Sequence, residues 1–183
     1  NAKKKKKNSY HVYSRMQRYK LMMEQALFYA LQNNEYAVHY QPIVDSKGKC
    51  VFLEALLRWN NPVFKDISPI TFIPFLEESG EIIKVGKWVY SEACQQITNL
   101  KKDEKYSGLK ISVNLSQVQI EHNNFVEDFN KIAKETGIDK NNILLEVTEN
   151  RSFREIDYVI EVLTELKTRN IGIAVLDDYG SGY

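Results

Sequence analysis

Four short apolar runs in this sequence each end in an oxygen-bearing side chain. They are VFLEALLRW with Glu54, KISVNLS with Asn114, ILLEVTE with Glu146, and IAVLDDYGSGY with Asp177 and Asp178. The last three sites lie 32 (146−114) and 31 (177−146) positions apart, about the length of one strand–helix unit in a (β/α) barrel. Because parallel strands end at one rim, we expect these oxygens to gather there around a divalent cation.

Carboxylate and amide oxygens are hard ligands, which favour Mg²⁺ or Mn²⁺ over zinc. The adjacent pair Asp177-Asp178 suits two ions, one shared and one terminal, and two ions can together activate a water and neutralise a phosphodiester. Each feature also has an ordinary structural explanation. Asp-Asp before a glycine can form a turn, and Asn114 or Glu149 can cap a helix.

Other catalytic patterns are missing from the sequence. The three histidines, His11, His39 and His122, are not spaced with a Cys, Glu or second His as zinc sites require. There is no GxSxG elbow, no P-loop and no GxGxxG fingerprint. Arg58 follows the Glu54 run, where its guanidinium is placed either for a phosphate oxygen or for an ion pair with a nearby acid.

Composition indicates one domain with a real core. The 183 residues are 43% hydrophobic, with 25 basic and 24 acidic side chains, so DNA or RNA polymers are not expected partners. Lys3 to Lys7 is read as a solvated stretch, with a nucleic-acid or lipid patch as the lesser alternative. Cys50 and Cys94 are read as free thiols. No signal peptide or membrane span is recognised, so we expect a cytoplasmic domain, anchored to a membrane only through upstream regions.

Periodicity predicts an α/β architecture. Residues 37–44 and 50–58 form strands joined by the turn DSKG, so the first two strands run antiparallel. The remaining strands are apolar and suit a parallel sheet. About five strands are found where a closed barrel needs eight, so we expect an incomplete TIM-like (β/α) barrel with an antiparallel first strand, and further chain after Tyr183. The other predicted elements are helices at 19–32, 72–79, 125–136 and 156–169, a helix containing Trp88 and Leu100, and strands at 109–115, 143–148 and 171–176.

Five motifs together resemble the EAL family of cyclic di-GMP phosphodiesterases. They are YQPIV…FLEALLRWNNP, FIPFLEESG, SVNLS, LLEVTEN and LDDYGSGY, in the order found in that family. The likeness covers Tyr19 to Tyr183, so residues 19–183 are expected to be the N-terminal part of an EAL domain. Residues 1–18 are similar to the end of a GGDEF domain and its linker, which often precede an EAL domain.

The resemblance implies a role for each candidate residue. Mg²⁺ or Mn²⁺ is the implied cofactor, in a two-metal site. Glu149 would steady the catalytic loop that begins at Asp177, and Gln41 and Arg58 would face the nucleotide. The implied metal ligands are Glu54, Asn114, Glu146, Asp177 and Asp178, and the implied catalytic residues are Glu54, Asp177, Asp178 and Glu149.

The implied reaction is attack of a metal-activated water on one phosphodiester bond of cyclic di-GMP, which gives linear pGpG. Homodimerisation and upstream GGDEF and sensor domains are the implied partners. The family's later Lys, Glu and Gln fall beyond Tyr183, so this stretch by itself is expected to be inactive. Two alternatives stay open: an inactive EAL-like receptor for cyclic di-GMP, and a scaffold that neither binds nor cleaves it. Asn61 and Tyr179 depart from the family pattern, at positions where His and Phe are usual.

Overall fold

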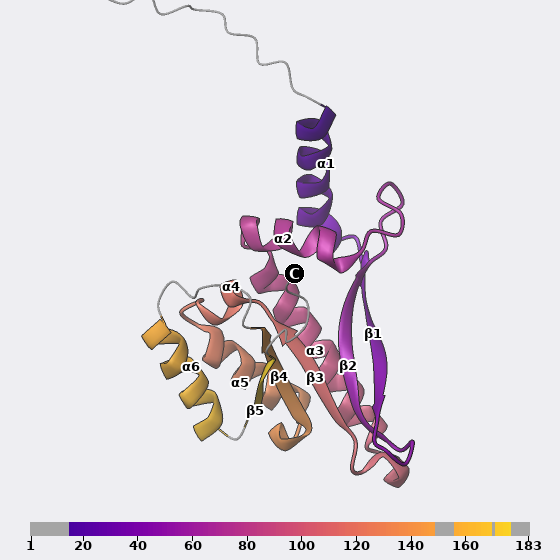
Figure 1. Cartoon of the computed structure of the whole chain (residues 1–183), viewed down its shortest axis with the longest axis vertical. Coiled ribbons are helices and arrows are strands. Elements are labelled where there is room, and N and C mark those ends of the chain that lie inside the picture. Colours follow the sequence, from indigo (N-terminus) through magenta and orange to yellow (C-terminus); the bar gives the residue numbers. More distant parts are fainter. Residues whose placement is uncertain (1–14, 149–155, 170, 177–183) are drawn as a thin grey trace, which may run out of the picture.

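We describe a computed structural model of the chain, which covers residues 15–148, 156–169 and 171–176 (Figure 1). Helices and strands alternate after an initial hairpin. In order they are α1 (Arg15–Ala30), β1 (Tyr36–Val44), β2 (Cys50–Trp59), α2 (Pro69–Ser79), α3 (Ile82–Leu100), β3 (Lys110–Leu115), α4 (Gln117–Ile120), α5 (Phe125–Thr136), β4 (Ile143–Thr148), α6 (Ile156–Thr168) and β5 (Gly172–Leu176), with 3₁₀ turns at Glu104–Tyr106 and Lys140–Asn142.

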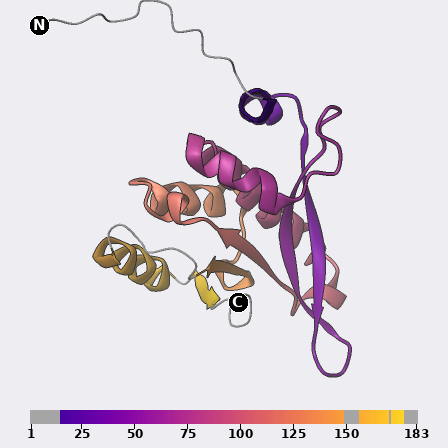
Figure 2. The same ribbon diagram turned by 45° about the horizontal axis from the view of Figure 1, so that its top comes forward.

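The five strands form one sheet in sequence order, β1-β2-β3-β4-β5. β1 pairs antiparallel with β2, and the pairs β2–β3, β3–β4 and β4–β5 are all parallel. Figures 1 and 2 show the β1–β2 hairpin at one side of the sheet and α6 at the other, with α3 and α5 between them. The sheet stays open, so the predicted incomplete barrel with an antiparallel first strand pair is confirmed.

Helices bury one face of this sheet. α3 carries buried residues at helical spacing, including Val85, Val89 and Ala93, and packs against β3 and α5. Tyr90 of α3 meets Phe129 of α5 with ring centroids 4.2 Å apart. The alternate strand residues beneath these helices are almost fully buried: Ile111, Val113, Leu115, Ile143, Leu145 and Val147. The opposite face, which would line the inside of a barrel, is left to carry the polar side chains.

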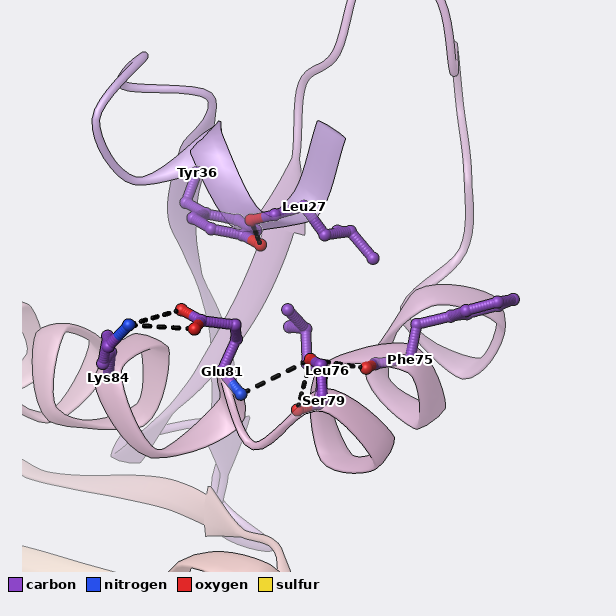
Figure 3. Close-up of polar contacts among 7 residues, drawn as sticks. All are labelled: Leu27, Tyr36, Phe75, Leu76, Ser79, Glu81 and Lys84. Atoms are coloured by element: carbon purple, nitrogen blue, oxygen red, sulfur yellow. Dashed lines mark hydrogen bonds and ion pairs between the residues drawn. The ribbon is translucent and has the colours of Figure 1, made fainter. Parts of the chain in front are cut away.

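The FIPFLEESG motif forms the joint between α2 and α3 (Figure 3). Gly80 adopts φ 76°, a left-handed conformation that ends α2 at low cost because glycine has no Cβ. The Ser79 hydroxyl donates to the Phe75 carbonyl at 2.8 Å and accepts from the Glu81 backbone N–H at 3.4 Å. Lys84 pairs with Glu81 at 2.9 Å. These local bonds hold α2 over the carboxyl end of β2.

Three details differ from the predicted elements. α1 begins at Arg15 rather than at residue 19, so one helix crosses the predicted boundary between residues 18 and 19. The short helix α4 has no apolar periodicity and was not predicted. Glu54 lies inside β2 rather than at the end of a strand, in keeping with the predicted strand bounds 50–58. Among the described residues, no helix has the length and apolar character needed to cross a membrane.

A close contact between α3 and α4 fixes the turn that follows β3. A Cβ placed on Gly86 would lie 1.8 Å from Nε2 of Gln119. The Gln119 side chain is buried, and its Oε1 accepts the Ser116 backbone N–H at 3.0 Å, which closes a capping box at the start of α4. Gly86 therefore leaves room for the glutamine that shapes the turn just after Asn114.

We expect Gly86→Ala to destabilise the protein by about 1–2 kcal/mol, because the new methyl group displaces Gln119 and breaks its bond to Ser116. Gly108→Ala is the matched control, since nothing lies within 4 Å of its Cβ position. Urea unfolding of both variants measures the difference. In a Gln119→Ala background the Gly86→Ala cost should disappear, and an undiminished cost there would contradict this packing.

Candidate metal centre

The strand register brings the candidate ligands into two neighbouring rows on the open face of the sheet. In the first row, Gln41 of β1 is paired with Glu54 of β2, which is paired with Ser112 of β3. In the second row, Asn114 of β3 is paired with Glu146 of β4. Ser112 and Asn114 are two residues apart and so share one face, since side chains alternate along a strand. Three of the predicted ligands therefore come together from three adjacent strands.

A direct hydrogen bond joins two of these ligands across the rows. The Asn114 amide Nδ2 donates to Oε1 of Glu54 at 2.8 Å. Asn114 is exposed and Glu54 is half-buried, so both remain accessible from the open face. Because the amide N–H is used by Glu54, the amide oxygen of Asn114 is the atom left to act as a ligand. The bond fixes the orientation of the two side chains relative to each other.

Glu146 is the buried member of the group, with 8% of its surface exposed. Burial raises the pKa of its carboxyl above the ordinary value, the Ser112 hydroxyl acts in the opposite direction, and the negative charge of Glu54 raises the pKa further. A buried carboxylate beside another carboxylate is unfavourable unless a positive charge accompanies them. A bound cation would therefore lower the electrostatic free energy of this pair of acids.

The donor set of two carboxylates and one amide oxygen fits Mg²⁺ or Mn²⁺, which prefer oxygen ligands. Among the residues that the structure describes, no group of three His, Cys, Asp or Glu side chains is placed to hold a metal, because the third donor here is Asn114. Asp177, Asp178 and Glu149 lie outside the described residues. Their roles stay predictions, although Asp177 directly follows β5, the strand next to Glu146.

Arg58 lies further along β2, on the same face as Glu54 and roughly 13 Å from it by strand rise. Its Nη1 donates to the Leu57 carbonyl at 2.9 Å. Arg58 lines two hollows: a mostly apolar cavity of about 380 Å³, which also includes Asn114, and a more open one of about 690 Å³, which includes His39. Gln41 is exposed beside Glu54. Contact of either residue with a nucleotide stays a prediction.

Sequence reasoning missed Glu35 as an organiser of the loop after β2. Its Oε2 accepts the Trp59 indole N–H at 3.0 Å and the Asn61 amide N–H at 2.7 Å. Asn61 in turn accepts the backbone N–H groups of Val63 and Phe64 at 2.9 and 3.0 Å. Asn61, which departs from the family pattern, therefore has a structural role. Glu35 precedes the first strand with no motif around it, so no sequence signal pointed to it.

The described geometry agrees with comparisons to known proteins. The family model for the EAL domain matches residues 24–183. The chain belongs to the EAL domain family. It is 35% identical over 155 residues to the bifunctional diguanylate cyclase/cyclic di-GMP phosphodiesterase MucR of Pseudomonas aeruginosa, covering 84% of this chain and 22% of MucR. It is 30% identical over 164 residues to the cyclic di-GMP phosphodiesterase PdeR of Escherichia coli, covering 89% of this chain and 24% of PdeR.

Solved structures of EAL proteins share the fold. The MucR phosphodiesterase in complex with c-di-GMP superimposes with a TM-score of 0.79 at 33% identity, over 88% of this chain and 65% of that one. The EAL enzyme Bd1971, bound to cAMP and cyclic-di-GMP, gives a TM-score of 0.79 at 29% identity, over 92% of this chain and 46% of that one. This EAL chain therefore spans about a fifth to a quarter of the curated relatives named above, and part of the solved domains.

We expect Glu35→Ala to cost about 1–3 kcal/mol of unfolding free energy, because it leaves the Trp59 and Asn61 donors without their acceptor. Chemical denaturation measures this cost. Glu78→Ala is the control, since within the described residues Glu78 pairs with the exposed Lys20, and its loss should change stability by less than about 0.5 kcal/mol. Equal effects of the two substitutions would contradict the role assigned to Glu35.

Glu146→Gln is expected to stabilise the metal-free domain at neutral pH. The raised pKa of Glu146 means that its contribution to stability is present below the unfolded value of 4.5 and is lost as the pH rises through the folded value. Glutamine cannot ionise and escapes this loss. In EDTA across pH 4–8, the difference in unfolding free energy between Glu146→Gln and the wild type should widen as the pH rises. The control Glu161→Gln, on the exposed side of α6, should show no such widening. A gap independent of pH would contradict the assignment.

Proposed function

We propose that this EAL domain hydrolyses cyclic di-GMP to linear pGpG with the help of Mg²⁺ or Mn²⁺. The observation that carries the proposal is the convergence of Glu54, Asn114 and Glu146 on one face of three adjacent strands. Three of the five expected ligands are thereby close together, and two of these three are carboxylates. Membership of the EAL family and the named phosphodiesterase relatives support the same reaction.

In this proposal, some residues of the site bind the cations and others bind the substrate. Glu54, Asn114 and Glu146 would hold the ions, together with Asp177 and Asp178, and Glu149 would steady the loop that begins at Asp177. Bound ions of this kind lower the pKa of water and offset the charge of a phosphodiester.

The surroundings of Arg58 suit a nucleotide. Its guanidinium offers paired N–H donors to a phosphate oxygen, and Gln41 offers an amide beside Glu54. The mostly apolar cavity that Arg58 and Asn114 line together with residues of α2 and α3 offers a nucleobase an apolar surface near Asn114. We infer that cyclic di-GMP lies along the open face of the sheet, from Arg58 to the carboxylates. This position would place one phosphodiester near the ions.

We also propose the organisation of the longer protein. Residues 1–18 would be the end of a GGDEF-like domain and its linker, and residues 19–183 the N-terminal part of the EAL domain, in agreement with the bifunctional name of MucR. The continuous α1 would then couple the two domains mechanically. We expect the full-length protein to form a homodimer and to be cytoplasmic, or attached to a membrane only through its upstream regions.

The decisive substitution is Glu54→Ala in the full-length protein that contains this sequence. With Mg²⁺ present, conversion of cyclic di-GMP to pGpG, followed by chromatography, should fall below detection while the unfolding midpoint stays close to that of the wild type. Loss of one of two adjacent carboxylates removes a ligand and the acceptor of the Asn114 amide. Glu78→Ala, on an exposed surface, should keep full turnover.

Three outcomes would contradict parts of this proposal. Wild-type turnover by Glu54→Ala would refute the metal assignment. A wild-type protein that binds cyclic di-GMP tightly and yields no pGpG would be a receptor rather than an enzyme. A protein that neither binds nor cleaves it would leave only a scaffold role.

A further inference from the structure

Ser112 lies next to the candidate ligands on the open face of the sheet. It is paired with Glu54 on one side and with Leu144 on the other, and it precedes Asn114 by two residues on β3. Glu146 is two residues beyond Leu144 on β4, so Ser112 is its diagonal neighbour across the strand pair. The serine is therefore in contact range of both carboxylates and shares their face.

The hydroxyl of Ser112 is buried without an ordinary partner. The residue has 0% exposure, and its Oγ makes no hydrogen bond of standard length and angle among the described residues. A buried hydroxyl without a partner costs about 1–3 kcal/mol, which alanine at the same position would avoid. The local fold gains nothing from the hydroxyl, so its presence calls for a partner within the site.

Glu146 is the partner that the surroundings indicate. The Ser112 hydroxyl opposes the effect of burial on Glu146 by lowering the pKa of this carboxyl, as a donor to a carboxylate does. Glu54, the other neighbour, already accepts the Asn114 amide, whereas Glu146 is given no other side-chain donor within the described residues.

We propose that Ser112 is a positioning residue, whose hydroxyl donates to one carboxylate oxygen of Glu146 and leaves the other oriented toward a bound divalent cation. The proposal rests on the metal site of the proposed function. Groups that hold metal ligands in this way contribute to metal affinity because they fix the orientation of the ligand before the ion arrives.

The test is the affinity of the full-length protein for Mn²⁺ alone, measured by calorimetry and by the loss of the free-ion electron paramagnetic resonance signal at one fixed pH. Ser112→Ala should weaken binding about tenfold. Ser112→Thr keeps the hydroxyl and should restore affinity to within about threefold of the wild type. Thr98→Val is the matched control, because Thr98 on α3 also has a buried hydroxyl without a partner, away from the site, and should bind Mn²⁺ as the wild type does.

Each remaining outcome overturns one part of the account. Wild-type affinity in Ser112→Ala would refute the role of Ser112 and leave the proposed function intact. Equal losses in Ser112→Ala and Ser112→Thr, with normal unfolding midpoints, would assign Ser112 to packing. If the wild type binds no Mn²⁺, the metal site of the proposed function falls, and the inference about Ser112 falls with it.

Discussion

The register of β3 between β2 and β4 is the constraint on which the candidate site depends. Pairing of Glu54 with Ser112, and of Asn114 with Glu146, places two carboxylates and one amide on a single face. A shift of one residue would turn the Asn114 side chain toward the helices, because strand side chains alternate. The buried residues Ile111, Val113 and Leu115 prevent this shift, since it would expose them. The hydrophobic core therefore holds the polar site in place from the opposite face.

This arrangement lowers the stability of the metal-free fold, because it places two acidic side chains near each other. Glu146 is buried near Glu54, and both burial and the neighbouring charge oppose its ionisation. A structural protein would gain stability by replacing either acid with a neutral side chain. Retention of both acids, linked through the Asn114 amide, is what a cation-binding site requires, and functional sites commonly carry such a penalty. The same reasoning gives Ser112 its significance, because its buried hydroxyl lowers the pKa of Glu146 and so opposes this cost.

Much of the fold could be predicted because local patterns and tertiary packing agree. The hairpin of β1 and β2, the helix from Phe125 to Thr136 with Gly137 after it, and the strand from Ile143 to Thr148 were predicted with their observed bounds or close to them. Apolar spacing, turn residues and the glycine stop all indicated the same elements. Convergence of Glu54, Asn114 and Glu146 was predicted from parallel strands ending at one rim, and the structure brings them together within the sheet, on one face of β2, β3 and β4.

Other features depend on contacts that no local pattern encodes. Glu35 reaches Asn61 across 26 positions of sequence, and Gly86 accommodates Gln119 from a different helix. Motif resemblance named the candidate ligands but not the residues packed around them.

Anomalous diffraction from crystals of the full-length protein grown with Mn²⁺ tests the central claim most directly. The account predicts a manganese peak about 2.0–2.4 Å from oxygens of Glu54, Asn114 and Glu146. A protein that binds Mn²⁺ elsewhere, with these three side chains away from any peak, would contradict it.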